Sequence, residues 1–311
     1  MKKNFLTAAL SLALSLNVIG AWADDNTGSN ESATINPTYY VNAPRFVRPL
    51  VEKWIGEYQK SNPEAHFAIA QTAAGKKKSS VSVILQEKTE VTPGAKTVYF
   101  AQYAILPVTS KDSQAEKILA KKSLNTKSLK KLFFVGDDVE EADNKDKTLE
   151  QVVVYAGNSN GSLAAPFASY YGEQADNFRG KRISGDDFYL NSAIAEDLKG
   201  VTFNALPNVY DLQSRQLKDN LAVLPIDAGQ EFKTSVSSLD NLIGVLENTH
   251  VKGIPVEKIG FSYTNNRTID AFVSWILSQG TGYNHQFGLL KLSEKEVAQE
   301  STKVDQYTAQ K

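Results

Sequence analysis

The stretch that decides the fold is residues 96–110, KTVYFAQYAILPVTS, where aromatic, aliphatic and β-branched side chains follow one another almost without interruption. Such a run predicts one long strand. Before it, residues 46–62 carry apolar side chains at helical spacing and stop at Pro63, while HFAIAQ and VSVILQ predict shorter strands. The chain therefore opens as β-α-β, which is typical of an α/β architecture.

The signals continue to alternate after this stretch. Residues 150–156 predict a strand that leads through the loop 157–161 into a helix at 162–171. Further helices are expected at 113–121, 127–133, 184–200, 238–247 and 267–279, and further strands at VTFNAL, NLAVLPID and EKIGFSYT. Residues 293–311 are polar and predict a loose or helical tail.

The N-terminal residues predict export. Lys2 and Lys3 precede the apolar stretch FLTAALSLALSLNVIG, and Ala21-Trp22-Ala23 is a small-residue cleavage signal. Residues 1–23 are therefore expected to be a cleavable signal peptide, and the polar residues 24–36 a disordered leader. Because no later stretch is apolar enough to cross a bilayer, we expect a soluble periplasmic protein without membrane insertion.

Composition excludes several function classes. The chain of 311 residues has no cysteine, which rules out disulfides, thiol catalysis and a lipidated cysteine. Its formal net charge of −1 provides no basic field to recruit nucleic acid. No metal-ligand spacing and no Gly-rich nucleotide loop occurs, and Asp186-Asp187 is a lone acidic pair. The sequence thus predicts no metal and no cofactor.

The loop 157–161, Gly-Asn-Ser-Asn-Gly, matches the G-x-S-x-G nucleophile elbow of serine hydrolases. In this alternative Ser159 is the nucleophile and His285 the base, with Asp240 or Asp270 as the orienting carboxylate. No oxyanion segment precedes the loop, and the pattern arises by chance in many Gly- and Ser-rich loops. A polar loop that opens a helix is also an anion cradle, so we expect a binding protein rather than an enzyme.

Five segments, taken in order, carry a family resemblance: FVRPLVEKWIGEYQKSNPEAHFAI, YAILPVTSKDS, SLNTKSLKKLFFVGDD, NLAVLPIDA and TIDAFVSWILSQGTGYNHQFGLLKL. They resemble the substrate-binding proteins of phosphate ABC transporters, the PstS-like branch of the type 2 periplasmic binding proteins. The resemblance covers most of residues 38–292. The overall pattern is similar to a divergent branch found in Bacteroidetes-type bacteria.

The resemblance implies an α/β fold of two lobes with two hinge-crossing strands and a ligand in the cleft between the lobes. It assigns 37–100 and 225–292 to lobe 1, 101–224 to lobe 2, and 293–311 to the tail. It further implies a monomer that captures a small anion, such as phosphate, for the permease of a membrane ABC transporter. The alternative is that the same fold serves as a protein- or peptide-interaction module without an inorganic ligand.

Three loops at helix starts are implied to present backbone N–H groups and hydroxyls to the anion. By position they contain Ala43, Pro44, Arg45 and Phe46 in the first, Gly75, Ser79 and Ser80 in the second, and Asn158, Ser159, Asn160, Gly161 and Ser162 in the third.

These loops depart from the family pattern. The first lacks the usual hydroxyls, the second reads Ala-Ala-Gly where Gly-Ser-Gly is usual, and the third lacks an arginine near Ala156. A buried dianion requires several charge-assisted donors. The candidate replacements are Arg45, Arg48, Arg179, Lys181 and Arg182.

Overall fold

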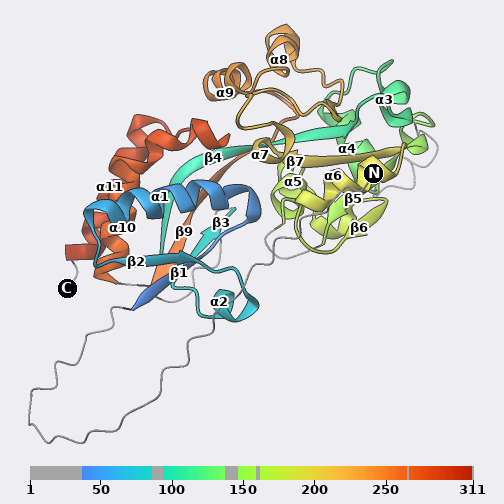
Figure 1. Ribbon diagram of the computed structural model, residues 1–311. Coiled ribbons are helices and arrows are strands. Elements are labelled where there is room, and N and C mark those ends of the chain that lie inside the picture. The colour runs from blue at the N-terminus through green and yellow to red at the C-terminus, as the bar shows by residue number, and fades with distance from the viewer. Residues whose placement is uncertain (1–36, 86–93, 137–145, 159–161, 265, 310–311) are drawn as a thin grey trace, which may run out of the picture. The chain divides into compact units, whose positions relative to one another are not determined.

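The computed structural model describes residues 37–85, 94–136, 146–158, 162–264 and 266–309, so the predicted signal peptide and leader lie outside the described residues. The described chain is a mixed α/β fold in which β4 (Ala95–Ser110) joins two sheets (Figure 1). This strand is the one expected from residues 96–110, and the alternation of helices and strands predicted around it is confirmed.

The first sheet combines strands from both ends of the chain. Its order is β2 (His66–Ile69), β1 (Thr38–Asn42), β3 (Val81–Ile84), β9 (Val256–Thr264) and β4. β1 is parallel to β2 and β3, whereas β9 is antiparallel to β3 and β4. The helices that pack with this sheet are α1 (Arg48–Ser61), α10 (Arg267–Ser278) and α11 (Glu294–Ala309).

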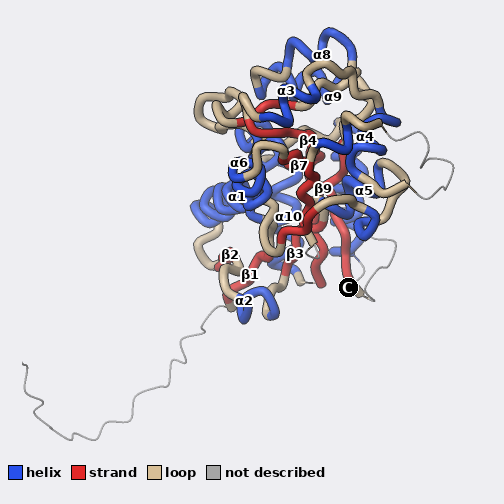
Figure 2. Tube along the Cα trace, turned by 90° about the vertical axis from the view of Figure 1, so that its right-hand side faces the viewer, coloured by secondary structure: helices blue, strands red, loops and turns tan. Residues whose placement is uncertain are grey.

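The second sheet is built on the other half of β4. β4 pairs antiparallel with β7 (Gly200–Ala205) and β8 (Leu221–Val223), and β7 is parallel to β5 (Val153–Gly157), which is parallel to β6 (Lys181–Ile183). The helices of this part of the chain are α3 (Gln114–Leu119), α4 (Thr126–Phe133), α5 (Ala164–Tyr170), α6 (Phe188–Glu196) and α7 (Leu206–Val209). Figure 2 shows β4 and β7 with α6 on one side and α4 and α5 on the other.

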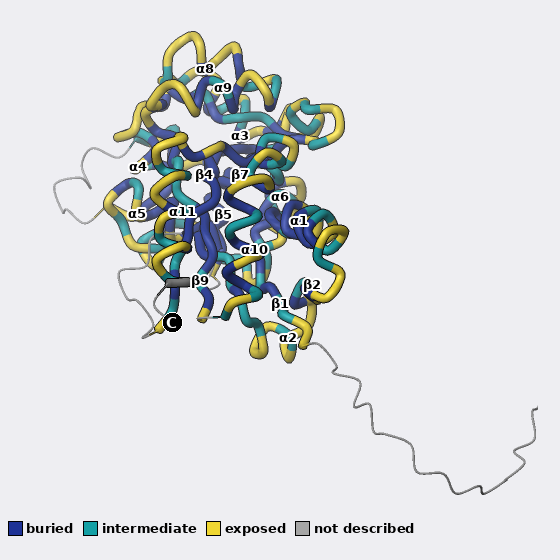
Figure 3. Tube along the Cα trace, turned by 90° about the vertical axis from the view of Figure 1, so that its left-hand side faces the viewer, coloured by how far each residue is buried: buried dark blue, intermediate teal, exposed yellow. Residues whose placement is uncertain are grey.

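β4 changes partners halfway along its length. Residues up to Ala104 pair with β9, and residues from Ile105 pair with β7. Most of β4 is buried, in contrast to the exposed helix α2 (Ala73–Lys77; Figure 3). β4 therefore passes from the first sheet into the second between Ala104 and Ile105.

α8 (Gly229–Ser235) and α9 (Leu239–Asn248) lie in the connection between β8 and β9.

The polar tail predicted from residue 293 is the helix α11, which packs against α10 and β4. The Glu300 carboxylate on α11 is buried and accepts the N–H of Tyr99 at 3.0 Å. Lys96 on β4 and Asp270 on α10 form a buried ion pair, and the Lys96 ammonium lies 4.8 Å from the ring centroid of Tyr307 on α11. The tail thus closes over a charged pair in the interior.

Candidate functional site

Two loops meet at one edge of the second sheet because they follow adjacent parallel strands. β5 and β6 end together, with Gly157 opposite Ile183. Beyond them, the Asn158 amide donates to Ser184 Oγ at 3.0 Å. The carboxyl ends of parallel strands are where ligands bind in open α/β sheets. This edge is the candidate functional site.

Asp187, which precedes α6, is the most unusual side chain at this edge. It is 8% exposed; its Oδ2 accepts the N–H of Leu163 at 2.8 Å, and its Oδ1 has no hydrogen-bond partner among the described residues. Burial raises the pKa of Asp187 to about 7; the Leu163 N–H opposes this rise and the charge of Asp186 adds to it. The carboxylate is therefore poorly compensated where it lies.

Gly157 makes room for this carboxylate. A Cβ at position 157 would lie 2.8 Å from Asp187 Oδ1 and 3.0 Å from the Cβ of Ser162, whose side chain is also buried. Glycine is therefore required here by close approach, and a side chain would displace Asp187. The first glycine of the G-x-S-x-G pattern has a structural explanation that needs no nucleophile.

The first predicted loop reaches the same region. Arg45 is exposed, and its guanidinium carbon lies 4.2 Å from the ring centroid of Phe188, the residue after Asp187. Phe46 is buried and lies 5.8 Å from the ring of Tyr103 on β4. Burial raises the pKa of Tyr103, with smaller contributions from Glu257 and Asp187. The first loop, β4 and the start of α6 therefore converge.

The second predicted loop lies around α2. Gly75 donates its N–H to Thr72 Oγ1 within the first turn of α2, and Ser79 Oγ donates to the Lys76 carbonyl. Ser80 bonds to the neighbouring strand β1. These contacts lie within α2 and with the neighbouring strand β1, and a role of the second loop at the site stays a prediction. In the third, Ser159, Asn160 and Gly161 lie outside the described residues.

Four of the five candidate basic residues already have partners. Arg48 donates to the carbonyl oxygen of Ala43, and Arg179 donates to those of Leu149 and Val152. Arg182 donates to the carbonyl oxygen of Ala175, and Lys181 donates to the hydroxyl of Tyr155. These contacts hold the side chains against neighbouring loops, and the Nε of Arg179 and the Nη1 of Arg182 are buried without a hydrogen-bond partner among the described residues. Within the part of the chain that the structure describes, Arg45 alone of the five has no polar side-chain contact.

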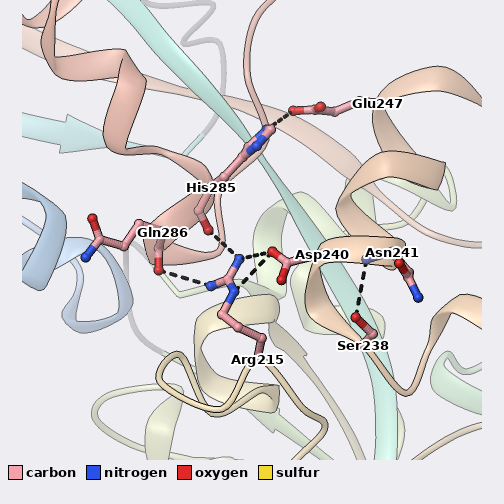
Figure 4. Close-up of polar contacts among 7 residues, drawn as sticks. All are labelled: Arg215, Ser238, Asp240, Asn241, Glu247, His285 and Gln286. Atoms are coloured by element: carbon pink, nitrogen blue, oxygen red, sulfur yellow. Dashed lines mark hydrogen bonds and ion pairs between the residues drawn. The ribbon is translucent and has the colours of Figure 1, made fainter.

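The structure contradicts the choice of Asp240 or Asp270 as the carboxylate that orients His285 in the serine hydrolase hypothesis. His285 Nε2 lies 2.7 Å from Glu247 Oε1 (Figure 4). Asp240 is bound to Arg215, and Asp270 to Lys96 in the interior. Neither predicted aspartate orients the histidine, because each is held by a basic residue elsewhere, and Ser159 lies outside the described residues.

Arg215 is the centre of the cluster in Figure 4, which joins three segments. Its backbone has a left-handed φ of 62°. The guanidinium donates to Asp240 Oδ1 at 2.7 and 3.1 Å, to the His285 carbonyl at 2.7 Å and to the Gln286 carbonyl at 3.1 Å. The loop after α7, the start of α9 and the segment after α10 are thus tied together.

We expect Arg215→Ala to lower the free energy of unfolding by about 2 kcal/mol, because charge-assisted bonds to two carbonyls are lost. Arg215→Gly should cost about 1 kcal/mol less, since glycine adopts the left-handed conformation without strain. Asp240 is 62% exposed, so Asp240→Asn should have a small effect. Urea unfolding measures all three. Equal losses for the alanine and glycine variants would contradict the strain argument.

Comparison with known proteins supports the fold. The chain resembles a candidate phosphate ABC transporter substrate-binding protein with bound phosphate from Clostridium perfringens, with a TM-score of 0.55 and 14% identity over 83% of this chain and 100% of the other. It also resembles an ABC-type phosphate transport receptor from Vibrio cholerae, with a TM-score of 0.55 and 10% identity over 82% and 100%. The predicted two-lobe α/β fold of type 2 periplasmic binding proteins is confirmed.

Other comparisons are negative. No protein-family model matches the chain, and no curated protein matches it either.

The described ranges contain no helix long and apolar enough to span a membrane. In the same ranges no three His, Cys, Asp or Glu side chains come together in a way that could hold a metal ion.

Asp187 is the site residue that sequence reasoning missed. Asp186-Asp187 was visible only as a lone acidic pair, considered for a metal. The signal that could have pointed to it is its place near the start of the helix expected at 184–200. Its burial depends on Gly157 and Ser162, which lie in a different strand-to-helix connection.

Proposed function

We propose that this chain is a non-enzymatic solute-binding protein, exported by its signal peptide to the periplasm, which binds a small solute between two lobes and passes it to the permease of an ABC transporter. The lobes are 37–100 with 225–292, and 101–224. The observation that supports this best is the meeting of the first loop with the second sheet, where Arg45 lies on Phe188. Loops at the carboxyl ends of strands in both halves then face a common ligand.

The proposed solute is a small anion, phosphate or a related oxyanion, or a molecule that carries such a group. Arg45 provides the positive charge, and Ala43, Pro44, Phe46, Asn158 and Ser162 line the site. The family resemblance in sequence and the likeness of fold to two phosphate-binding proteins support this ligand class. A Bacteroidetes-type origin and a monomeric state stay predictions.

A thermal shift series tests the proposal. A solute at 100 times its Kd adds about 2.7 kcal/mol to the stability of the protein that binds it, so the Tm should rise by several degrees. We expect this for at least one compound among phosphate, sulfate, phosphonates and carboxylates at millimolar concentration. Arg45→Ala should abolish the rise, and Arg267→Ala, which changes an exposed arginine at the start of α10, should keep it.

One observation favours the interaction module as a second candidate. Arg48, Arg179 and Arg182 donate to backbone carbonyls, which leaves an inorganic dianion with few charged donors. If no small solute raises the Tm while the fold is intact, the solute-binding proposal is wrong and the interaction module gains weight.

A further inference from the structure

Asp187 raises a question of charge balance. One carboxylate oxygen is bound by the Leu163 N–H, and the other has no partner among the described residues, although the residue is more than nine-tenths buried. Leaving a buried polar atom unsatisfied costs free energy, and native structures rarely do so without a reason. A basic residue would be the usual remedy, yet the described residues include no Lys or Arg in an ion pair with Asp187.

The neighbouring residues leave room for Asp187 Oδ1. Gly157 lacks the Cβ that would lie 2.8 Å from Oδ1, and the small Ser162 lies next to Gly157. Asn204 holds the backbone of Asp187 in place, because its Nδ2 donates to the Asp187 carbonyl at 2.8 Å. The carboxylate is thus positioned by fixed neighbours and not by a countercharge.

A positive charge without a polar partner among the described residues lies against Phe188, the residue after Asp187. The Arg45 guanidinium rests on the Phe188 ring, and no polar partner of this side chain occurs within the described ranges. The two groups come from different halves of the fold, Arg45 from the loop before α1 and Asp187 from the start of α6. Separation of the halves by the hinge motion of such binding proteins would lift Arg45 from Phe188.

We propose that Asp187 determines specificity at this site: its Oδ1 accepts a hydrogen bond from an ammonium group of the solute, while Arg45 pairs with the solute's carboxylate or phosphonate. The ligand class is therefore a small zwitterion. A neutral hydroxyl would leave the buried charge uncompensated, and an inorganic dianion would be repelled by it. This inference rests on the proposed function and deepens it by naming the solute.

The experiment compares each zwitterion with the analogue that lacks its amine. The panel contains the common L-amino acids and aminomethylphosphonate, with the matching carboxylic acids and methylphosphonate, together with inorganic phosphate and sulfate. Thermal shift identifies a ligand and calorimetry measures its Kd. We expect at least one zwitterion to raise the Tm and its deaminated analogue to do so only at concentrations about 10- to 100-fold higher, as for a lost charge-assisted hydrogen bond.

Two variants assign the effect to Asp187. Asp187→Ala should weaken the zwitterion about 10- to 100-fold. Asp187→Asn keeps the size of the side chain and an oxygen for the Leu163 N–H but loses the charge, so it should weaken binding as well while remaining folded. Asp305→Asn makes the same change of charge at an exposed position on α11 and should leave the Kd unchanged.

Equal binding of the deaminated analogue, or an unchanged Kd in Asp187→Asn, would overturn the inference. If phosphate or sulfate stabilises the protein and no zwitterion does, the proposed solute-binding function holds and only this inference fails. If no compound of the panel changes the Tm of the wild-type protein, both fail.

Discussion

Replacing Lys96 by alanine is expected to lower the free energy of unfolding by about 3–5 kcal/mol, because Asp270 is left buried without its countercharge. Lys96 is 5% exposed and Asp270 is 2% exposed. The ammonium lies 2.8 and 2.9 Å from the two carboxylate oxygens, so the pair is well formed. Equilibrium unfolding in urea, followed by circular dichroism, measures the loss.

Two controls separate the buried charge from a general loss of contacts. The double variant Lys96→Met with Asp270→Leu should recover most of the stability, since apolar residues of similar volume often replace a buried pair at no cost. Lys258→Met removes a partner of Glu296 from a pair whose side chains are 41% and 29% exposed, and it should cost about 1 kcal/mol or less. A loss from Lys96→Ala no larger than this would contradict the prediction.

Asp187→Asn is expected to become progressively more stable than the wild-type protein as the pH rises from about 4 to about 7. The pKa of Asp187 is raised to about 7 by burial in the folded chain, whereas it is near 4 in an unfolded chain. The folded state therefore holds the proton more tightly. The stability that Asp187 contributes is fully present below about pH 4 and is lost as the pH rises through about 7.

The expected size is about 4 kcal/mol, from about three pKa units at 1.36 kcal/mol each. Urea unfolding of both proteins at a series of pH values without ligand measures the difference. Asp305→Asn, which changes an exposed carboxylate on α11, should run parallel to the wild-type protein. A constant difference between Asp187→Asn and wild type at all pH values would show that Asp187 titrates normally.

The sequence was sufficient for most of the longer helices and strands because those signals are local, but it did not predict short elements such as β6, α7 and α8. The apolar run at 96–110 and the helical spacing at 46–62 correspond to β4 and to α1 with the short helix before it. The positions of the first and third loops also follow from this order. The periodicity does not give the distances between the loops, so the grouping of all three loops around one ligand stays a prediction.

The sequence could not predict which charged residues pair with each other, because partners can lie far apart in the chain. Lys96 and Asp270 are 174 positions apart, and nothing in the spacing of either residue indicates a partner. Arg179 and Arg182 were candidate replacements for the missing charge, but burial among loops directs them to backbone carbonyls, which need donors as much as an anion does. Asp187 was missed because its environment comes from another strand-to-helix connection.

The position of β9 between β3 and β4 has a consequence for the order of folding during synthesis. All strands of the second sheet are present in the chain once β8 has been made, whereas the first sheet lacks the strand between β3 and β4 until residue 264 has emerged. Until then β3 and the first half of β4 have open edges, which are prone to pair with other chains. The first sheet, whose strands begin to be synthesised first, is thus completed last. The open edges of its early strands must be protected from pairing with other chains for most of the time that synthesis takes.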